Sequence, residues 1–253
     1  MRELLLIGIG TGNPDHVTVQ AVEALNRTRV FFVVDKGAEK ASLLALREEI
    51  LRRHVRDQDG YRVVEIPDPP RDRTATAYAG AVDDWHERRA QLFAAAIRDE
   101  LGPDEVGAFL VWGDPSLYDS TLRVLDKIRD VDFEYDVDFE YSVIAGITSV
   151  QALTAAHRLP LNRIGEPIVI TPARQLAADA SNAVVMLDGG FAAADLTGTD
   201  VYWGAYLGSP DEVLIAGRLP DVAAEIVATK ARLRAQHGWI MDSYLIRRPR
   251  DDE

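Results

Sequence analysis

Runs of consecutive apolar residues alternate along the first half of the chain with segments whose apolar residues recur every three or four positions. The runs have the length of strands buried on both faces of a sheet, and the periodic segments have the spacing of helices with one apolar face. The pattern predicts strands at residues 4–9, 30–34, 61–66 and 106–112. It predicts helices at residues 17–28, 41–54, 77–101 and 120–129. This alternation is typical of an α/β fold with a mostly parallel sheet.

The second half is richer in short strands. They are predicted at residues 143–145, 167–171, 183–187, 201–205, 212–216 and 244–247, with helices at 149–157 and 220–237. We therefore expect two α/β domains: an N-terminal domain over residues 1–118 with a mostly parallel sheet, and a C-terminal domain over 119–253 with a mixed sheet. Residues 131–136 are almost repeated by 137–142, and we interpret this acidic duplication as a tolerated insertion in a strand or loop.

Charge and composition exclude several kinds of binding partner and chemistry. The 253 residues include 41 acidic and 28 basic side chains, a formal net charge of −13 that repels nucleic-acid phosphates. The chain has no cysteine, which excludes disulfides and thiolate chemistry. No apolar run has the length of a membrane span, and the run at residues 4–9 is too short for a signal peptide. We expect a cytoplasmic protein with neither a nucleic-acid nor a membrane partner.

The histidines and loops exclude several classes of enzyme. None of the five histidines stands in an H-x-x-x-H or H-E-x-x-H pattern, so no metal site is expected. The chain also lacks the phosphate-binding loop of nucleoside triphosphatases and the serine turn of α/β-hydrolases.

Glycines end the first predicted strand in the pattern Gly8-x-Gly10-x-Gly12. Glycines at a strand's carboxyl end allow a tight turn and a close approach to a ligand. Asp35, after the second strand, stands roughly where a nicotinamide-binding fold carries its acidic residue. The third glycine is one residue early for that fold, however, and Pro14 interrupts the turn. A dinucleotide site and a turn without a ligand both remain open.

Two further motifs follow buried strands. Residues 112–118 read WGDPSLY, in which Asp114 either binds ligand hydroxyl groups or caps a turn. Residues 145–149 read AGITS, in which Thr148 and Ser149 either face a ligand or only cap the next helix. Arginines gather near residues 71–89, where their guanidinium groups suit a substrate with several carboxylates or are simply solvated.

The ordered set of motifs resembles the tetrapyrrole methylase family, the class III S-adenosylmethionine methyltransferases of corrin and sirohaem synthesis. The resemblance covers nearly the whole chain, and it rests on residues 8–14, 110–121, 146–153, 160–167, 185–190 and 202–208. It implies two α/β domains with a ligand cleft between them, S-adenosylmethionine as cofactor, S-adenosylhomocysteine as its product, and a homodimer. Within the family the segments are most similar to enzymes that methylate precorrin-5 at C-1 and release acetate to give precorrin-6A.

The resemblance also assigns residues. Cofactor contacts are expected at Trp112, Gly113, Asp114, Pro115, Ser116, Leu117, Tyr118, Thr148, Ser149, Met186 and Leu187. Substrate contacts are expected at Gly10, Gly12, Pro14, Arg73, Arg88 and Arg89. Release of an acetyl group also needs proton transfer and charge stabilisation, for which Asp35, Asp114, Tyr118 and His157 are candidates. Asp35 and Tyr118 are the preferred catalytic residues, Asp35 because it ends the second strand at the expected ligand edge. The alternatives are another precorrin or uroporphyrinogen methyltransferase, a nicotinamide-dependent oxidoreductase, and a binding module without catalysis.

Overall fold

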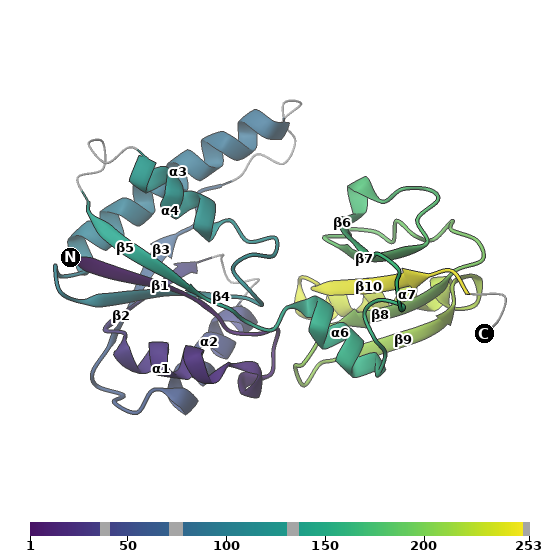
Figure 1. The fold of residues 1–253 in the computed structure, drawn as a ribbon, viewed down its shortest axis with the longest axis horizontal. Coiled ribbons are helices and arrows are strands. Elements are labelled where there is room, and N and C mark those ends of the chain that lie inside the picture. The colour runs from purple at the N-terminus through teal and green to yellow at the C-terminus, as the bar shows by residue number, and fades with distance from the viewer. Residues whose placement is uncertain (36–40, 71–77, 131–136, 250–253) are drawn as a thin grey trace. The chain divides into compact units, whose positions relative to one another are not determined.

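The computed structural model describes residues 1–35, 41–70, 78–130 and 137–249, and they form two compact units (Figure 1). The first unit contains Met1–Gly10 and Pro14–Ile147, and the second contains Thr11–Asn13 and Thr148–Glu253. The expected boundary after residue 118 is therefore too early. The strand after it belongs to the first unit, because it pairs with the N-terminal strand.

The first unit is built on a five-stranded parallel sheet in the order β3-β2-β4-β1-β5. Its strands are β1 (Arg2–Gly8), β2 (Val30–Asp35), β3 (Arg62–Pro67), β4 (Val106–Val111) and β5 (Phe139–Ile144). Its helices are α1 (Val19–Arg27), α2 (Ala41–His54), α3 (Tyr78–Glu100) and α4 (Thr121–Asp130), with a short 3-10 helix, η1 (Pro14–His16).

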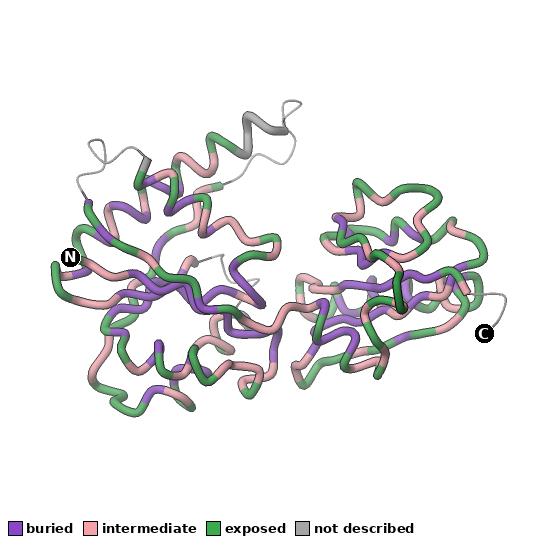
Figure 2. The backbone as a smooth tube through the Cα atoms, viewed as in Figure 1, coloured by how far each residue is buried: buried purple, intermediate pink, exposed green. Residues whose placement is uncertain are grey.

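Alternation along β1 explains why the first apolar run is continuous. Leu4 and Leu6 pack in the core cluster that includes Phe93 of α3, and Leu5 and Ile7 pack in the cluster that includes Leu25 of α1. Because helices cover both faces of the sheet, both sets of side chains are buried (Figures 1 and 2). The predicted mostly parallel sheet is confirmed.

Residues 139–142, in the second copy of the acidic duplication, form the first part of β5. Phe139 and Val137 are buried, and β5 pairs with β1 along its length. The second copy is therefore part of the sheet, and the first copy, residues 131–136, lies outside the described residues, so that the tolerated insertion stays a prediction.

The second unit contains a mixed sheet in the order β6-β7-β10-β8-β9, as predicted. Its strands are β6 (Val169–Pro172), β7 (Asn182–Met186), β8 (Asp200–Ala205), β9 (Val213–Arg218) and β10 (Asp242–Arg247). Only β6 and β7 pair in parallel; the other described pairs are antiparallel. Its helices are α6 (Ser149–His157) and α7 (Leu219–His237), with a 3-10 turn, η3 (Ala173–Gln175). Ile226 and Leu233 of α7 share a core with Trp203 and Tyr244 of the sheet.

The described helices include none that is long and apolar enough to cross a membrane. Across the same residues, no group of three His, Cys, Asp or Glu side chains is arranged to hold a metal ion.

Candidate functional site

The three glycine motifs meet at the carboxyl edge of the parallel sheet. A Cβ atom on Gly8 would lie 2.6 Å from the backbone nitrogen of Gly146 and 2.9 Å from the carbonyl oxygen of Gly113. Gly10 and Gly113 form a backbone bridge, with N–H···O distances of 3.3 and 2.7 Å. The ends of β1, β4 and β5 thus approach one another through backbone alone, and side chains would separate them.

Asp114 ties two of these motifs together. Its carboxylate accepts hydrogen bonds from the backbone N–H of Gly146 (2.7 Å) and Ser116 (2.8 Å), and from the Ser116 hydroxyl. Burial acts to raise the pKa of Asp114, but these three hydrogen bonds outweigh it and hold the pKa below its usual value. The carboxylate is therefore ionised at neutral pH, and its first role is to fix the turn on which the other predicted cofactor contacts lie.

Exposure to solvent differs along the turn that follows β4. Gly113, Asp114 and Pro115 are buried, whereas Ser116 is exposed. Tyr118 is 44% exposed and has a left-handed backbone with φ of 51°. A non-glycine residue in this region costs about 1–2 kcal/mol, and such strain is concentrated at functional sites. The remaining predicted contacts here, Trp112 and Leu117, are half-buried.

The other predicted cofactor contacts lie in the second unit. Thr148 is the N-cap of α6: its hydroxyl accepts the backbone N–H of Val150 (3.2 Å), and the Gln151 side chain accepts the N–H of Thr148 (3.0 Å). Ser149 begins that helix. Met186 ends β7, and Leu187 follows it.

The predicted substrate loop is divided between the units. Gly10, with φ of 76°, belongs to the first unit, where a Cβ would lie 2.8 Å from the Cβ of His16. Gly12 belongs to the second, where a Cβ would lie 2.9 Å from the carbonyl oxygen of Leu207. Pro14 opens η1 in the first unit. Side chains are excluded at both glycines.

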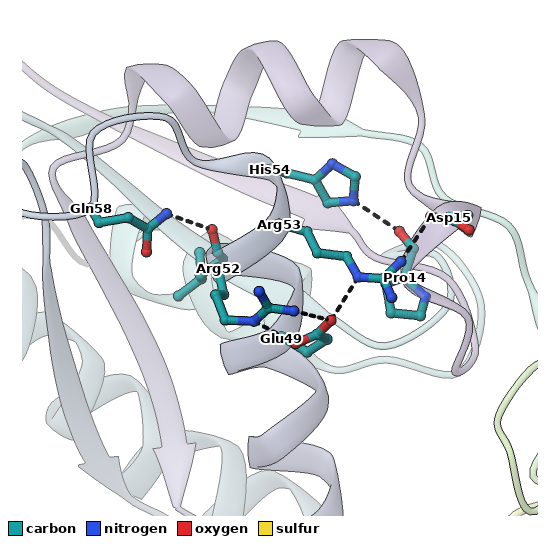
Figure 3. Close-up of polar contacts among 8 residues, drawn as sticks. Pro14, Asp15, Glu49, Arg52, Arg53, His54 and Gln58 are labelled. Atoms are coloured by element: carbon teal, nitrogen blue, oxygen red, sulfur yellow. Dashed lines mark hydrogen bonds and ion pairs between the residues drawn. The ribbon is translucent and has the colours of Figure 1, made fainter.

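The C-terminal end of α2 holds this loop in place (Figure 3). Arg53 contacts the carboxylates of Asp15 (3.1 Å) and Glu49 (2.6 Å). The Nε2 atom of His54 lies 3.0 Å from the carbonyl oxygen of Pro14 and donates to it. Hydrogen bonds from Arg52 and Arg53 lower the pKa of Glu49 to about 2. This group is not among the residues predicted from the sequence, although three basic residues in succession at a helix end, Arg52, Arg53 and His54, were a visible signal for it.

The arginines predicted to bind substrate differ in their surroundings. Arg89 is 4% exposed, pairs with Asp68 (3.3 Å) and donates to the Ser120 hydroxyl (2.7 Å). Its guanidinium also stacks on Trp85, 4.6 Å from the ring centre. This geometry argues against a substrate contact at Arg89 and gives it a structural role beside the turn that precedes α4. Arg88 is exposed, and Arg73 lies outside the described residues.

The two catalytic candidates remain predictions. Asp35 ends β2, which places its backbone at the carboxyl edge of the sheet; its side chain lies outside the described residues. Tyr118 is the exposed residue of the strained turn described above.

Comparison with known proteins identifies a family. The Tetrapyrrole (Corrin/Porphyrin) Methylases match the chain over residues 3–223. The chain is 47% identical to a precorrin-6A synthase [deacetylating] from Sinorhizobium sp over 260 aligned positions, which cover 99% of this chain and 97% of the relative.

Solved structures of similar proteins agree with this family. The chain is similar to a cobalamin synthesis related protein (CobF) from Corynebacterium diphtheriae, with 41% identity, 98% coverage of each chain and a TM-score of 0.83. It also shares its fold with a uroporphyrin-III C-methyl transferase from Thermus thermophilus that was solved with S-adenosyl homocysteine. That likeness has 17% identity, 97% coverage of each chain and a TM-score of 0.59, and it concerns the fold alone.

Proposed function

The chain belongs to the tetrapyrrole methylases, and we propose that it is a methyltransferase that methylates precorrin-5 at C-1 and releases the acetyl group as acetate, giving precorrin-6A. The observation that carries the proposal is the 47% identity, over nearly the full length of both chains, to a precorrin-6A synthase [deacetylating]. The expectation drawn from the ordered motifs agrees with this similarity.

The proposed cofactor is S-adenosylmethionine, whose sulfonium supplies an already activated methyl group when bound. The backbone cradle of Gly8, Gly113 and Gly146 supports such a site, because the three strand ends pack backbone against backbone and so bring together the turns that follow them. Asp114 fixes the cradle through its bonds to Gly146 and Ser116. The protein's contribution to methyl transfer is then mainly to align the donor with the attacking carbon.

The proposed cofactor contacts follow the resemblance. In the first unit they are Trp112, Gly113, Asp114, Pro115, Ser116, Leu117 and Tyr118. In the second unit they are Thr148, Ser149, Met186 and Leu187. The exposed, left-handed positions of Tyr118 and Leu187 support their inclusion, since strained backbone is retained where it serves a ligand.

Release of the acetyl group requires a second set of groups. Water must add to the acetyl carbonyl and lose a proton, and when the bond between the carbonyl carbon and C-1 breaks, its electron pair stays with the macrocycle. We assign Asp35 and Tyr118 as the candidates for this proton transfer. Among the predicted arginines, Arg88 is the one whose described exposure suits a contact with substrate carboxylates.

Calorimetry with S-adenosylhomocysteine and with NADH separates the main alternatives. We expect micromolar binding of S-adenosylhomocysteine and no binding of NADH. Binding of NADH alone would instead favour an oxidoreductase, the alternative suggested by the glycine loop and Asp35.

Incubation with S-adenosylmethionine and precorrin-5 then tests the reaction: equal amounts of precorrin-6A and acetate are expected. Cofactor binding with no turnover of precorrin-5 would favour another family substrate or a binding module. Light scattering tests the homodimer that the resemblance implies.

A further inference from the structure

A network of buried polar side chains lies in the second unit, directly behind the turn that follows β7. It consists of Asp188, Trp203, Lys230, Asp242 and Tyr244. All of them are buried except Asp242, which is half-buried as a residue although its carboxylate is enclosed. They come from four different elements: the turn itself, β8, α7 and β10. Asp188 lies in the segment 185–190 on which the resemblance rests, but no role was predicted for it, and the proposed chemistry uses neither Lys230 nor Asp242.

Lys230 stands at its centre. The ammonium group of Lys230 pairs with Asp242 at 2.5 Å, and the two side chains are only 5% and 4% exposed. The same ammonium donates to the backbone carbonyl of Asp188 at 3.0 Å. The indole N–H of Trp203 donates to Asp242 at 2.8 Å. Lys230 of α7 is thereby bound to the backbone of the turn, and its partner Asp242 is held by Trp203 of the sheet.

The side chain of Asp188 stabilises the turn of which it is part. Its carboxylate accepts the backbone N–H of Gly190 (2.9 Å) and of Ala192 (2.8 Å), and the hydroxyl of Tyr244 (2.7 Å). One helical turn beyond Lys230, Arg234 donates to the carbonyl of Gly189 at 3.1 Å. The described contacts therefore hold the backbone of residues 188–192 and the side chain of Asp188.

The residue that this arrangement presents is Leu187. It has φ of 55° and is 60% exposed, although it is a large apolar side chain. A leucine in the left-handed region persists only where its surroundings over-determine the backbone. The bonds to the carbonyl and carboxylate of Asp188, the next residue, provide that constraint.

A buried ion pair is a poor device for stability alone. Desolvation of two charges offsets much of their attraction, and apolar side chains of similar volume often serve folding as well or better. In this pair, burial raises the pKa of Asp242 even though Lys230 acts to lower it. The ion pair instead fixes the backbone of the turn, because the charged ammonium group of Lys230 holds the carbonyl group of Asp188 in one position.

We propose that Lys230, Asp242, Asp188 and Tyr244 are positioning residues that hold the Met186–Leu187 segment in the conformation that binds the cofactor. This inference rests on the proposed function, since it takes that segment to be a cofactor contact. It assigns the network a role in affinity for the cofactor that goes beyond folding of the second unit.

Two variants test it, with S-adenosylhomocysteine as the calorimetric probe. Tyr244→Phe removes one hydroxyl and keeps the ring that packs on Phe191. The double variant Lys230→Met/Asp242→Asn removes both charges and leaves an oxygen to accept from Trp203. We expect each to weaken S-adenosylhomocysteine binding roughly tenfold, because the turn is released to relax from the binding conformation.

Two controls separate positioning from stability. Tyr141→Phe breaks a similar tyrosine–aspartate bond in the first unit, to Asp126 at 2.5 Å. Leu233→Ala creates a cavity on the same helix as Lys230, at an apolar side chain that makes no hydrogen bond to the turn. Leu233→Ala is expected to lower the melting temperature more than Tyr244→Phe, yet both controls should keep the affinity of the unchanged protein.

The outcomes are distinct. If Leu233→Ala weakens binding as much as Tyr244→Phe, the network acts through stability and the proposal is overturned. Unchanged affinity in both network variants would overturn it as well. If the double variant does not fold, Tyr244→Phe decides. Failure of the unchanged protein to bind S-adenosylhomocysteine would instead refute the proposed cofactor itself, and with it this role of the network.

Discussion

Gly146 is the single position where a side chain is least tolerable at the sheet edge. An added Cβ would overlap the carbonyl oxygen of Gly113 and lie 2.8 Å from the Cα of Gly8. Overpacking of this kind typically costs about 1–3 kcal/mol. We expect Gly146→Ala to lower the melting temperature and to weaken S-adenosylhomocysteine binding by at least about tenfold, because the backbone strands of the cradle must move apart. Thermal scans and calorimetry measure the two effects.

Gly102→Ala is the matched control for this substitution. Its added Cβ would meet only the flexible side chain of Glu105, at 3.3 Å, in the loop between α3 and β4. Little change in melting temperature or affinity is expected. A Gly146→Ala protein that behaves like this control would show that the cradle accepts side chains, contrary to the geometry.

Asp114 predicts a pH dependence of stability. Its pKa is lower in the folded protein than in the unfolded chain, so it stabilises the fold above its unfolded value of about 3.9. That contribution disappears as the pH falls through the folded value. Asp114→Asn should therefore lower the free energy of unfolding by about 2 kcal/mol at neutral pH. The difference from the unchanged protein should shrink below about pH 4. Urea unfolding at a series of pH values would contradict this if the difference stayed constant.

Single residues were predictable where the backbone itself dictates their type. The glycines of the three motifs follow from a strand that must turn tightly at its end, and the structure brings Gly8, Gly113 and Gly146 together. Arg89 was not predictable in the same way. An arginine's place in the sequence does not reveal whether its guanidinium faces a ligand or, as here, Asp68 and a neighbouring loop.

At the scale of elements, the end of α2 acts as a clamp on η1. Arg53 joins Asp15 of η1 to Glu49 of α2 (Figure 3). Both partners are partly exposed, so its loss should cost less than about 1 kcal/mol in stability. We expect Arg53→Ala to raise the KM for precorrin-5 roughly two- to fivefold, with the affinity for S-adenosylhomocysteine unchanged, because the substrate loop loses an anchor.

Arg52→Ala is the control for the clamp. Arg52 binds the same Glu49, at 2.8 Å, and its described hydrogen bonds and ion pair all go to that residue and not to η1. Steady-state kinetics should give this variant the KM of the unchanged protein. Equal KM values for the two arginine variants would mean that the contact with Asp15 does not position the loop.

Whether a segment is a helix or a strand could be predicted from its periodicity, but the unit to which it belongs could not. The predicted bounds of α2 and α6 match the structure, and α6 begins where Thr148 supplies its N-cap. The boundary after residue 118 was placed too early, since nothing local shows that β5 pairs with β1. Pairing in a parallel sheet depends on contacts between distant segments, and a hydrophobic pattern does not specify its partner.

Charge makes a prediction at the scale of the whole molecule. A net charge of −13 repels a substrate that carries many carboxylates, even where an arginine such as Arg88 attracts it locally. Raising the ionic strength from about 10 to 100 mM shortens the screening length from about 30 to 10 Å and weakens this long-range repulsion first. We therefore expect kcat/KM for precorrin-5 to rise severalfold over that range. The affinity for S-adenosylhomocysteine, which has no net charge, serves as the control and should stay constant. A fall in kcat/KM would show that local attraction by arginines outweighs the field of the whole protein.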